Sequence, residues 1–161
     1  MILAGTGHRP QKIPNYRKEG KYELYRLVCN FLKDNPQYEI IISGGAIGFD
    51  TILALSAIRN ERKLITAVPC KEQDKFWSYD DKKTYAQILD KSDQVVYVSE
   101  EYSIDCMQKR NIFMIDNCDE VIALWDGVKK GGTYNAVKYA EQGKKKIINI
   151  WDSFNNKTPL F

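Results

Sequence analysis

A run of three isoleucines that leads into a glycine-rich turn constrains the fold of this chain more than any other feature. Ile40, Ile41 and Ile42 are consecutive β-branched residues, which predict a strand buried on both faces. The turn, residues 43–50, passes directly into a helical pattern over residues 51–60. A buried strand, a tight turn and a helix in this order are typical of an α/β protein with a parallel sheet.

The same alternation continues along the chain. Apolar runs predict strands over residues 1–5, 40–42, 63–68, 93–99, 120–125 and 146–151. Helical spacing of apolar residues predicts helices over residues 21–32, 51–60, 80–89, 106–116 and 134–142. A chain of 161 residues, 43% hydrophobic and 28% charged, has the size and composition of one soluble domain. We therefore expect one α/β domain over residues 1–161, a doubly wound and mostly parallel sheet with right-handed crossovers, helices on both faces and a short tail from about residue 152.

Charge and hydropathy narrow the function classes. The net charge of +3 argues weakly against a dedicated nucleic-acid binder, because contacts to a phosphate backbone usually bring a strong basic excess. The lysine clusters at residues 129–130 and 144–146 keep nucleic acid open as a partner, although such clusters are more often solvated helix ends. No apolar run is long enough to span a bilayer, and the N-terminus lacks the basic region of a signal peptide. We expect a cytoplasmic protein without a membrane partner.

The cysteine pattern does not suggest a metal site. Cys29, Cys70, Cys106 and Cys118 are widely scattered, form no C-x-x-C pair and have one histidine, His8, to join them. We expect reduced, structural thiols, no bound metal and no required cofactor.

Three loops that follow predicted strands carry residues suited to anions. They are residues 6–9 (Thr-Gly-His-Arg), 43–48 (Ser-Gly-Gly-Ala-Ile-Gly), and 126–127 (Asp-Gly) together with 131–133 (Gly-Gly-Thr). In open α/β sheets, ligands bind outside the carboxyl ends of the strands, and glycine turns at helix N-termini present N–H groups to phosphates. The sequence therefore predicts one pocket for a nucleotide or an ADP-ribose-like molecule.

Two carboxylates in these loops are suited to the sugar of such a ligand. Asp50 and Asp126 can accept hydrogen bonds from ribose hydroxyls. For Asp50, capping of the following helix is the alternative. Phe76 and Trp77 lie in a stretch without clear periodicity, where they either cover the core, which we favour, or stack on a base.

The motifs together resemble those of the SLOG superfamily. The matching motifs are Thr6-Gly7-His8-Arg9-Pro10, Ser43-Gly44-Gly45-Ala46-x-Gly48-x-Asp50, Arg110-Asn111, and Trp125-Asp126-Gly127 followed by Gly131-Gly132-Thr133-x-Asn135. The chain is most similar to the small YpsA-like branch, and more distantly to the DNA-processing protein DprA and the lonely-guy (LOG) enzymes. The resemblance implies a Rossmann-like fold that binds nucleotides or nucleotide-derived signals, often as a homodimer or higher oligomer.

Motifs and resemblance together give one set of predicted ligand-binding residues. It consists of Thr6, Gly7, His8, Arg9, Ser43, Gly44, Gly45, Ala46, Gly48, Asp50, Arg110, Asn111, Asp126, Gly127, Gly131, Gly132, Thr133 and Asn135. The leading hypothesis is a binding or sensing domain in which these residues hold a nucleotide or a nucleotide-derived small molecule.

Two other functions stay open. The first is an N-glycosidase or nucleotide hydrolase of the LOG or deoxyribosyltransferase type, with Asp50, Asp126, Glu100 or Glu101 as the carboxylate and His8 as acid or base. The resemblance speaks against the LOG route, because Ala136 stands where those enzymes carry a catalytic glutamate. The second is single-stranded DNA binding of the DprA type.

Overall fold

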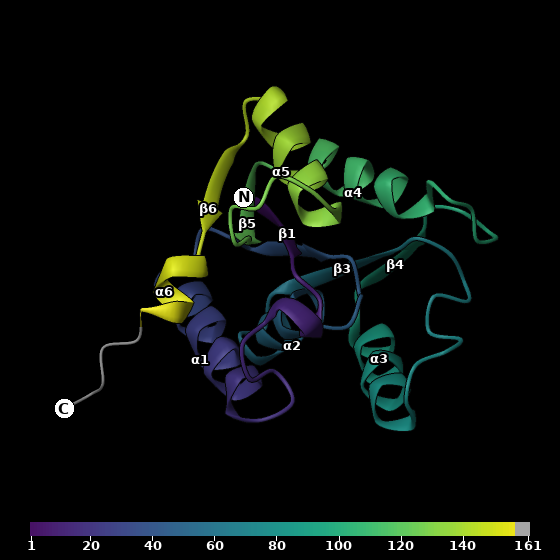
Figure 1. The fold of residues 1–161 in the computed structure, drawn as a ribbon, viewed down its shortest axis with the longest axis horizontal. Coiled ribbons are helices and arrows are strands. Elements are labelled where there is room, and N and C mark those ends of the chain that lie inside the picture. Colours follow the sequence, from purple (N-terminus) through teal and green to yellow (C-terminus); the bar gives the residue numbers. More distant parts are fainter. Residues whose placement is uncertain (157–161) are drawn as a thin grey trace.

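The computed structural model describes residues 1–156, which form one six-stranded parallel sheet with helices on both faces (Figure 1). The strands are β1 Ile2–Gly7, β2 Ile40–Ser43, β3 Lys63–Val68, β4 Gln94–Tyr97, β5 Glu120–Leu124 and β6 Lys146–Asn149. The helices are α1 Glu19–Asp34, α2 Phe49–Arg59, α3 Tyr79–Lys91, α4 Cys106–Asp116, α5 Gly132–Gln142 and α6 Trp151–Asn155, with a 3₁₀ turn at Pro10–Lys12. The predicted α/β class and Rossmann-like arrangement are confirmed.

The strand order, β4-β3-β2-β1-β5-β6, explains how the helices divide between the faces. From β1 to β4 the chain moves steadily toward one edge of the sheet, and then it returns across the sheet to β5. Right-handed crossovers place helices of the outward path on one face and those of the return path on the other. Accordingly α1, α2 and α3 lie on one side of the sheet, and α4 and α5 lie on the other (Figure 1).

Each face of the sheet has its own apolar cluster. On α1 the fully buried residues Leu24, Val28 and Leu32 recur every fourth position and pack with α2 in the larger cluster. The smaller cluster joins α4 and α5 to the opposite face, where Met114 and Ala136 are among its buried members. Helical periodicity in the sequence therefore corresponds to real buried stripes.

The C-terminal part of the described chain differs from the prediction. The strand expected to reach Trp151 ends at Asn149, and Trp151 instead begins the short helix α6, which lies beside α1. Part of the predicted tail is therefore helical, and residues 157–161 lie outside the described part of the chain. No helix within residues 1–156 is both long and apolar enough to cross a membrane.

The sheet has its topological switch point between β1 and β5. The chain leaves β1 toward β2 on one side, while β5 pairs with β1 on the other, from Leu3 opposite Glu120 to Gly7 opposite Leu124. Loops that leave adjacent strands in opposite directions open a crevice at the carboxyl edge. The loops after β1 and β5 are two of the three that the sequence singles out.

Candidate functional site

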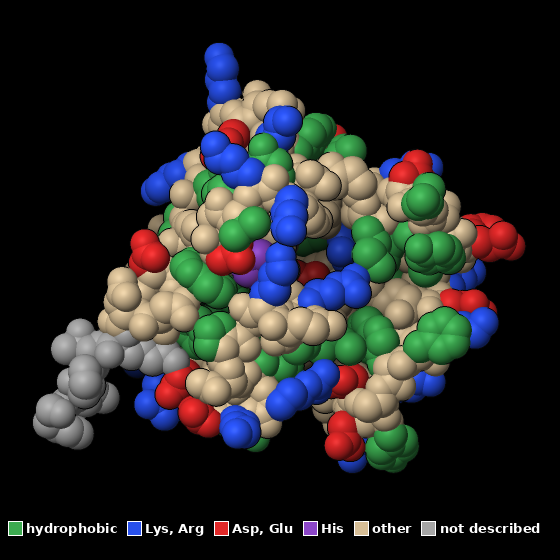
Figure 2. Space-filling model, in the orientation of Figure 1, with side chains coloured by type: hydrophobic (Ala, Val, Ile, Leu, Met, Phe, Trp, Pro, Cys, Tyr) green, Lys and Arg blue, Asp and Glu red, His purple; other side chains and the backbone are tan. Residues whose placement is uncertain are grey.

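A cleft of about 320 Å³ opens at this switch point. Its lining residues are Gly5, Thr6, Gly7, His8, Arg9, Gln11, Lys12, Ala46, Asp50, Met107, Arg110, Asn111, Lys130, Gly131, Gly132 and Thr133. They come from the end of β1, the turn before α2, the first half of α4 and the start of α5. Figure 2 shows Lys and Arg side chains gathered around a hollow in the middle of this face. The surroundings of the cleft therefore favour an anionic ligand.

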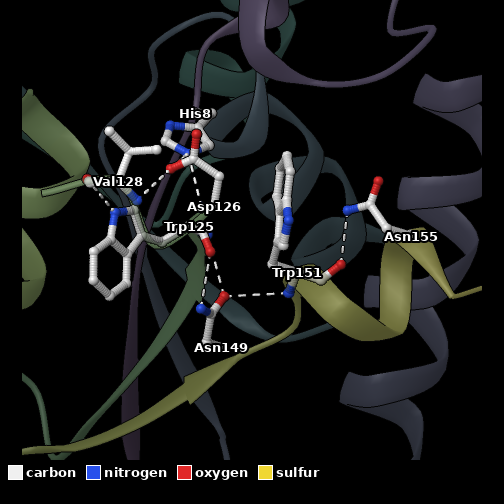
Figure 3. A network of polar contacts seen from close by, with 7 residues as sticks. All are labelled: His8, Trp125, Asp126, Val128, Asn149, Trp151 and Asn155. Carbon is white, nitrogen blue, oxygen red and sulfur yellow. Dashed lines mark hydrogen bonds and ion pairs between the residues drawn. The ribbon is translucent and has the colours of Figure 1, made fainter. Parts of the chain in front are cut away.

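The loop after β1 is joined to both neighbouring loops through His8. The N–H of Phe49, the first residue of α2, donates to the His8 carbonyl oxygen at 3.1 Å. On the other side, the Asp126 N–H donates to His8 Nε2 at 3.0 Å (Figure 3). One residue at the end of the central strand thus links the turn before α2 to the loop after β5.

The imidazole of His8 is a buried structural group. Its exposed fraction is 5%, and Trp151 packs against it edge to face with ring centroids 5.6 Å apart. Burial lowers the His8 pKa, although the nearby Asp126 carboxylate opposes that change. A neutral ring can accept the Asp126 N–H at Nε2, while a protonated ring would instead donate to Asp126 Oδ1, which lies 3.1 Å away. The lowered pKa favours the neutral form.

Asp126 belongs to this network rather than to the cleft wall. Its Oδ1 accepts the Val128 N–H at 3.0 Å, which closes the turn after β5. The side chain of Asn149 pairs with both backbone groups of Trp125, its Oδ1 accepting the N–H at 3.2 Å and its Nδ2 donating to the carbonyl at 2.9 Å (Figure 3). The ribose contact predicted for Asp126 therefore has no support in where the structure places its carboxylate.

The first glycine turn, residues 43–48, is filled by the protein itself. Ser43 is fully buried, and its hydroxyl donates to the Asp50 carbonyl at 2.8 Å and accepts the Gly45 N–H at 3.2 Å. A Cβ on Gly44 would lie 2.4 Å from Arg110 Nη1 and 2.6 Å from Asp50 Oδ2. A Cβ on Gly48 would lie 2.6 Å from the His8 carbonyl oxygen. These two glycines make room for neighbouring protein atoms.

A buried ion pair lies beneath that turn. Asp50 and Arg110 are 8% and 5% exposed, with Arg110 Nη1 at 4.0 Å from Asp50 Oδ2 and 2.5 Å from the Gly44 carbonyl oxygen. Asp50 also accepts the Ala46 N–H at 3.3 Å, and Arg110 Nε donates to Asn111 Oδ1 at 2.8 Å. Burial raises the Asp50 pKa against the attraction of Arg110, and burial lowers the Arg110 pKa against the attraction of Asp50. Asp50 thus occupies the positive end of α2 with a carboxylate of the protein.

The second glycine turn, which runs into α5, is open. Gly131 has φ of 96°, and a Cβ added at Gly131 or Gly132 would meet no atom within 4 Å. The first turn of α5 carries no acidic residue and no side-chain cap. Gly131, Gly132 and Thr133 line the cleft beside the exposed Lys130, so the positive dipole end of α5 lies at the cleft. Of the two predicted phosphate-binding turns, this one has room for an anion.

The structure brings some of the predicted site residues together and leaves others outside. The cleft wall contains Thr6, Gly7, His8, Arg9, Ala46, Asp50, Arg110, Asn111, Gly131, Gly132 and Thr133. The predicted residues that do not line it are Ser43, Gly44, Gly45, Gly48, Asp126, Gly127 and Asn135. Ser43, Gly44 and Gly48 support the wall from behind, through the contacts described above.

Four side chains of the cleft wall are absent from the set predicted from the sequence. They are Gln11, Lys12, Met107 and Lys130. The first two return to the cleft because Pro10 begins a 3₁₀ turn, and a proline at a loop exit was a usable signal. Arg9 Nη2 lies 3.2 Å from Met107 Sδ, so the loop after β1 reaches across to α4.

The carboxylates considered for hydrolysis are not assembled in the cleft. Glu100 is exposed and absent from the wall, and Asp50 is the single carboxylate among the lining residues. Ala136, which stands at the position of the LOG glutamate, is fully buried in the cluster under α4 and α5. The residues in the cleft are better arranged to hold an anion than to supply a free general acid.

The two aromatic residues of the irregular stretch have different surroundings. Trp77 is half-buried and packs edge to face on Tyr85 with centroids 5.1 Å apart, as the favoured packing interpretation requires. Phe76 is 91% exposed, so the expectation that it covers the core is wrong.

Comparison with known proteins identifies a family that matches most of this chain. A family model described as the YspA SLOG family matches residues 6–152. The SPbeta prophage-derived protein YoqJ of Bacillus subtilis, described as uncharacterized, is 37% identical over 139 residues, which cover 76% of this chain and 80% of that protein.

Among solved structures, two DNA processing proteins A share the fold. The Streptococcus pneumoniae protein has a TM-score of 0.64 and 18% identity, with 91% of this chain and 48% of that chain covered. The Helicobacter pylori protein, whose structure is described as showing a single-stranded DNA binding mode, has a TM-score of 0.65 and 23% identity, with 91% and 63% covered. This chain therefore spans about half to two thirds of these proteins, and the likeness shows the fold.

Proposed function

The chain belongs to the YspA SLOG family, and on that premise we propose that the cleft at the switch point binds a nucleotide or an ADP-ribose-like molecule. The single observation that carries the proposal is the open glycine turn at the start of α5, which lines the same cleft as the cationic side chains of Arg9 and Lys12 in the loop after β1. A phosphate at this position gains both main-chain N–H donors and the helix dipole.

The charges around the cleft fit one or two phosphate groups. Arg9, Lys12 and Lys130 line the cleft and are exposed, so their charges are available to a ligand. Charge-assisted hydrogen bonds from such groups are stronger than neutral ones, and a guanidinium can bind phosphate through two parallel bonds. The anion-binding groups therefore come from the loop after β1 and from the turn before α5.

The wall beyond the phosphate position is suited to the uncharged part of a nucleotide. The Asn111 amide is half-buried, and its Oδ1 accepts from Arg110 Nε, which orients the amide group toward a fixed partner. Thr6 and Thr133 add hydroxyls that can donate or accept. Asp50 is held by Ala46 and Arg110, so we assign it to the support of the turn rather than to ribose binding.

Isothermal titration with a panel of ligands tests the proposal. The panel contains adenosine, AMP, ADP, ADP-ribose, cyclic nucleotides, the guanine counterparts and a short single-stranded oligonucleotide. We expect phosphorylated ligands to bind and adenosine to bind at least about tenfold more weakly, because the phosphate supplies the main contact. Binding of none of the nucleotides would contradict the proposal. Binding of the oligonucleotide alone, with a steep salt dependence, would replace it with DNA binding.

A further inference from the structure

A second hollow lies on the helical face, away from the cleft. It measures about 380 Å³ and is bounded by α1, α2 and α3. Its lining includes the apolar Leu55 and Ile58, the exposed Tyr22, and the cations Lys21, Arg59 and Lys91. We call it the helical groove. It shares no residue with the nucleotide cleft.

The floor of the helical groove is the outer side of α2. That helix is apolar nearly all round, a pattern that is typical of a helix covered on every side. Its inner side packs on the sheet and one flank packs on α1, but Leu55 and Ile58 on the groove side are only half-buried. The chain therefore leaves apolar surface of its central helix without full cover.

The walls of the groove are two helices that do not close over it. Tyr22 of α1 is 69% exposed, and Tyr25 stands beside it in the wall. On the far side α3 contributes Gln87 and Ile88. Figure 1 shows α1 and α3 on either side of α2. Two helical walls over an apolar floor form a shape that accepts another helix through its i, i+3 and i+4 side chains. Tyrosine is a residue type that contributes strongly to protein interfaces, and the exposed Tyr22 is available for such a contact.

The charges of the helical groove select its occupant. Its charged lining residues are Lys21, Arg59 and Lys91, and all three are cations. A second copy of this chain, docked by the same groove around a two-fold axis, would bring these cations together, and like charges opposed across an interface are unfavourable. An occupant with an apolar stripe and flanking carboxylates satisfies both the floor and the rim.

We propose that the helical groove is a docking site for an acidic amphipathic helix of another protein. In this arrangement the apolar stripe of the partner helix covers Leu55 and Ile58, and its carboxylates pair with Lys21, Arg59 and Lys91. The nucleotide cleft stays open to its ligand when the groove is occupied, because the two sites have no lining residue in common.

Fluorescence anisotropy with model peptides tests the docking site. The probe is a labelled amphipathic helical peptide with leucines on one face and glutamates on the other, compared with the same peptide carrying lysines in place of the glutamates. We expect the glutamate peptide to bind at least about tenfold more tightly, and the triple variant Lys21→Glu, Arg59→Glu, Lys91→Glu to reverse this preference. The triple variant Lys129→Glu, Lys138→Glu, Lys144→Glu, at exposed positions outside the groove, makes the same change in net charge and is the matched control that keeps the original preference.

Three outcomes would overturn the proposal. The first is equal affinity for the two peptides, or no binding of either. The second is binding of the glutamate peptide that the triple charge variant leaves unchanged, which would place the peptide elsewhere. The third is a dimer of the chain in sedimentation velocity that Leu55→Asp dissociates, which would make the groove a contact between copies. None of these measurements uses a nucleotide, so failure here is distinct from failure of the nucleotide proposal.

Discussion

Two glycine turns precede helices in this molecule, and they use glycine for opposite purposes. In the turn before α2, glycines allow protein atoms to approach: Gly44 lies against the Asp50–Arg110 pair, and Gly48 lies against the loop after β1. In the turn before α5, Gly131 and Gly132 face open space. A similar sequence signal thus marks a packed junction in one place and an open helix N-terminus in the other.

The difference extends to the electrostatics of the two helix ends. The positive end of α2 already faces a carboxylate, that of Asp50, which is held by the Ala46 N–H. The first turn of α5 contains no acidic residue. Since an anion at a helix N-terminus is stabilising, one end is occupied by the protein and the other is available to a ligand. Four predictions test this comparison, in order of the expected size of the effect.

Removing the cation under the first turn is expected to have the largest effect. Arg110→Met leaves Asp50 buried without its partner, so we expect a loss of about 3–5 kcal/mol in the free energy of unfolding. The double variant Arg110→Met, Asp50→Asn should regain part of the lost unfolding free energy, because the buried charge is then removed. Urea denaturation measures both variants, with Lys109→Met as control, because the pair that Lys109 forms with Asp105 is solvent-exposed. If Arg110→Met were as stable as Lys109→Met, the first turn would not depend on the Asp50–Arg110 pair.

Adding one methyl group should separate the two turns by the sign of its effect. Gly44→Ala forces Cβ into Arg110 and Asp50, and we expect a loss of about 1–3 kcal/mol in unfolding free energy. Gly132→Ala meets no atom and replaces glycine in a helix, so we expect a gain of up to about 1 kcal/mol. Thermal and urea unfolding of the two variants give the comparison directly. Equal losses at both positions would remove the distinction between the turns.

A carboxylate placed at the open turn should separate stability from affinity. Gly132→Asp puts a negative charge at the start of α5, which is expected to add about 0.3–1 kcal/mol to stability while repelling the phosphate of a ligand. We expect affinity for the best nucleotide of the panel to fall by about tenfold or more, equivalent to about 1.4 kcal/mol. Gly132→Asn, which has nearly the same size as the aspartate without its charge, serves as the control in titration calorimetry and should lose less affinity than Gly132→Asp. Unchanged affinity in the aspartate variant would show that the phosphate does not bind at the start of α5.

The smallest expected effect concerns His8, which connects the two turns. Its pKa in the folded protein lies below the ordinary value of 6.5, so below that pH the unfolded chain binds the proton more readily than the folded one. Stability from this group is therefore complete above the ordinary pKa and is lost as the pH falls through the folded pKa. Unfolding free energies measured between about pH 7.5 and 5.5 should decrease in the natural protein and decrease less in His8→Asn. An identical slope in the two proteins would assign the pH dependence to other groups.

Much of the fold is predictable from local pattern and general topology. The apolar pattern of the sequence predicts buried strands such as residues 40–42 and the buried stripe of Leu24, Val28 and Leu32 on α1. Right-handed crossovers then determine on which face of the sheet each helix lies. The end of β6 is not predictable in this way, because Trp151 continues the apolar run. The strand stops where the Asn149 side chain accepts the Trp151 N–H, a turn that the pattern does not show.

The site is predictable at the level of loops and less so at the level of side chains. The positions of the motifs in the chain, combined with the rule for parallel sheets, bring the loops after β1 and β5 to one edge. Whether a glycine or a carboxylate of these loops faces the ligand or the protein depends on which groups from other parts of the sequence pack against it. Arg110 reaches the Gly44 carbonyl from α4, and His8 reaches the Asp126 N–H from the loop after β1. Such partners are set by tertiary packing rather than by the motif.

The central position of β1 also has a consequence for how the chain folds. This first strand pairs on one side with β2, which follows soon after it, and on the other with β5, from late in the sequence. During synthesis from the N-terminus, one edge of β1 therefore has no partner strand until β5 has been synthesised. Such long-range pairing slows folding and leaves an exposed edge open to wrong partners in the meantime.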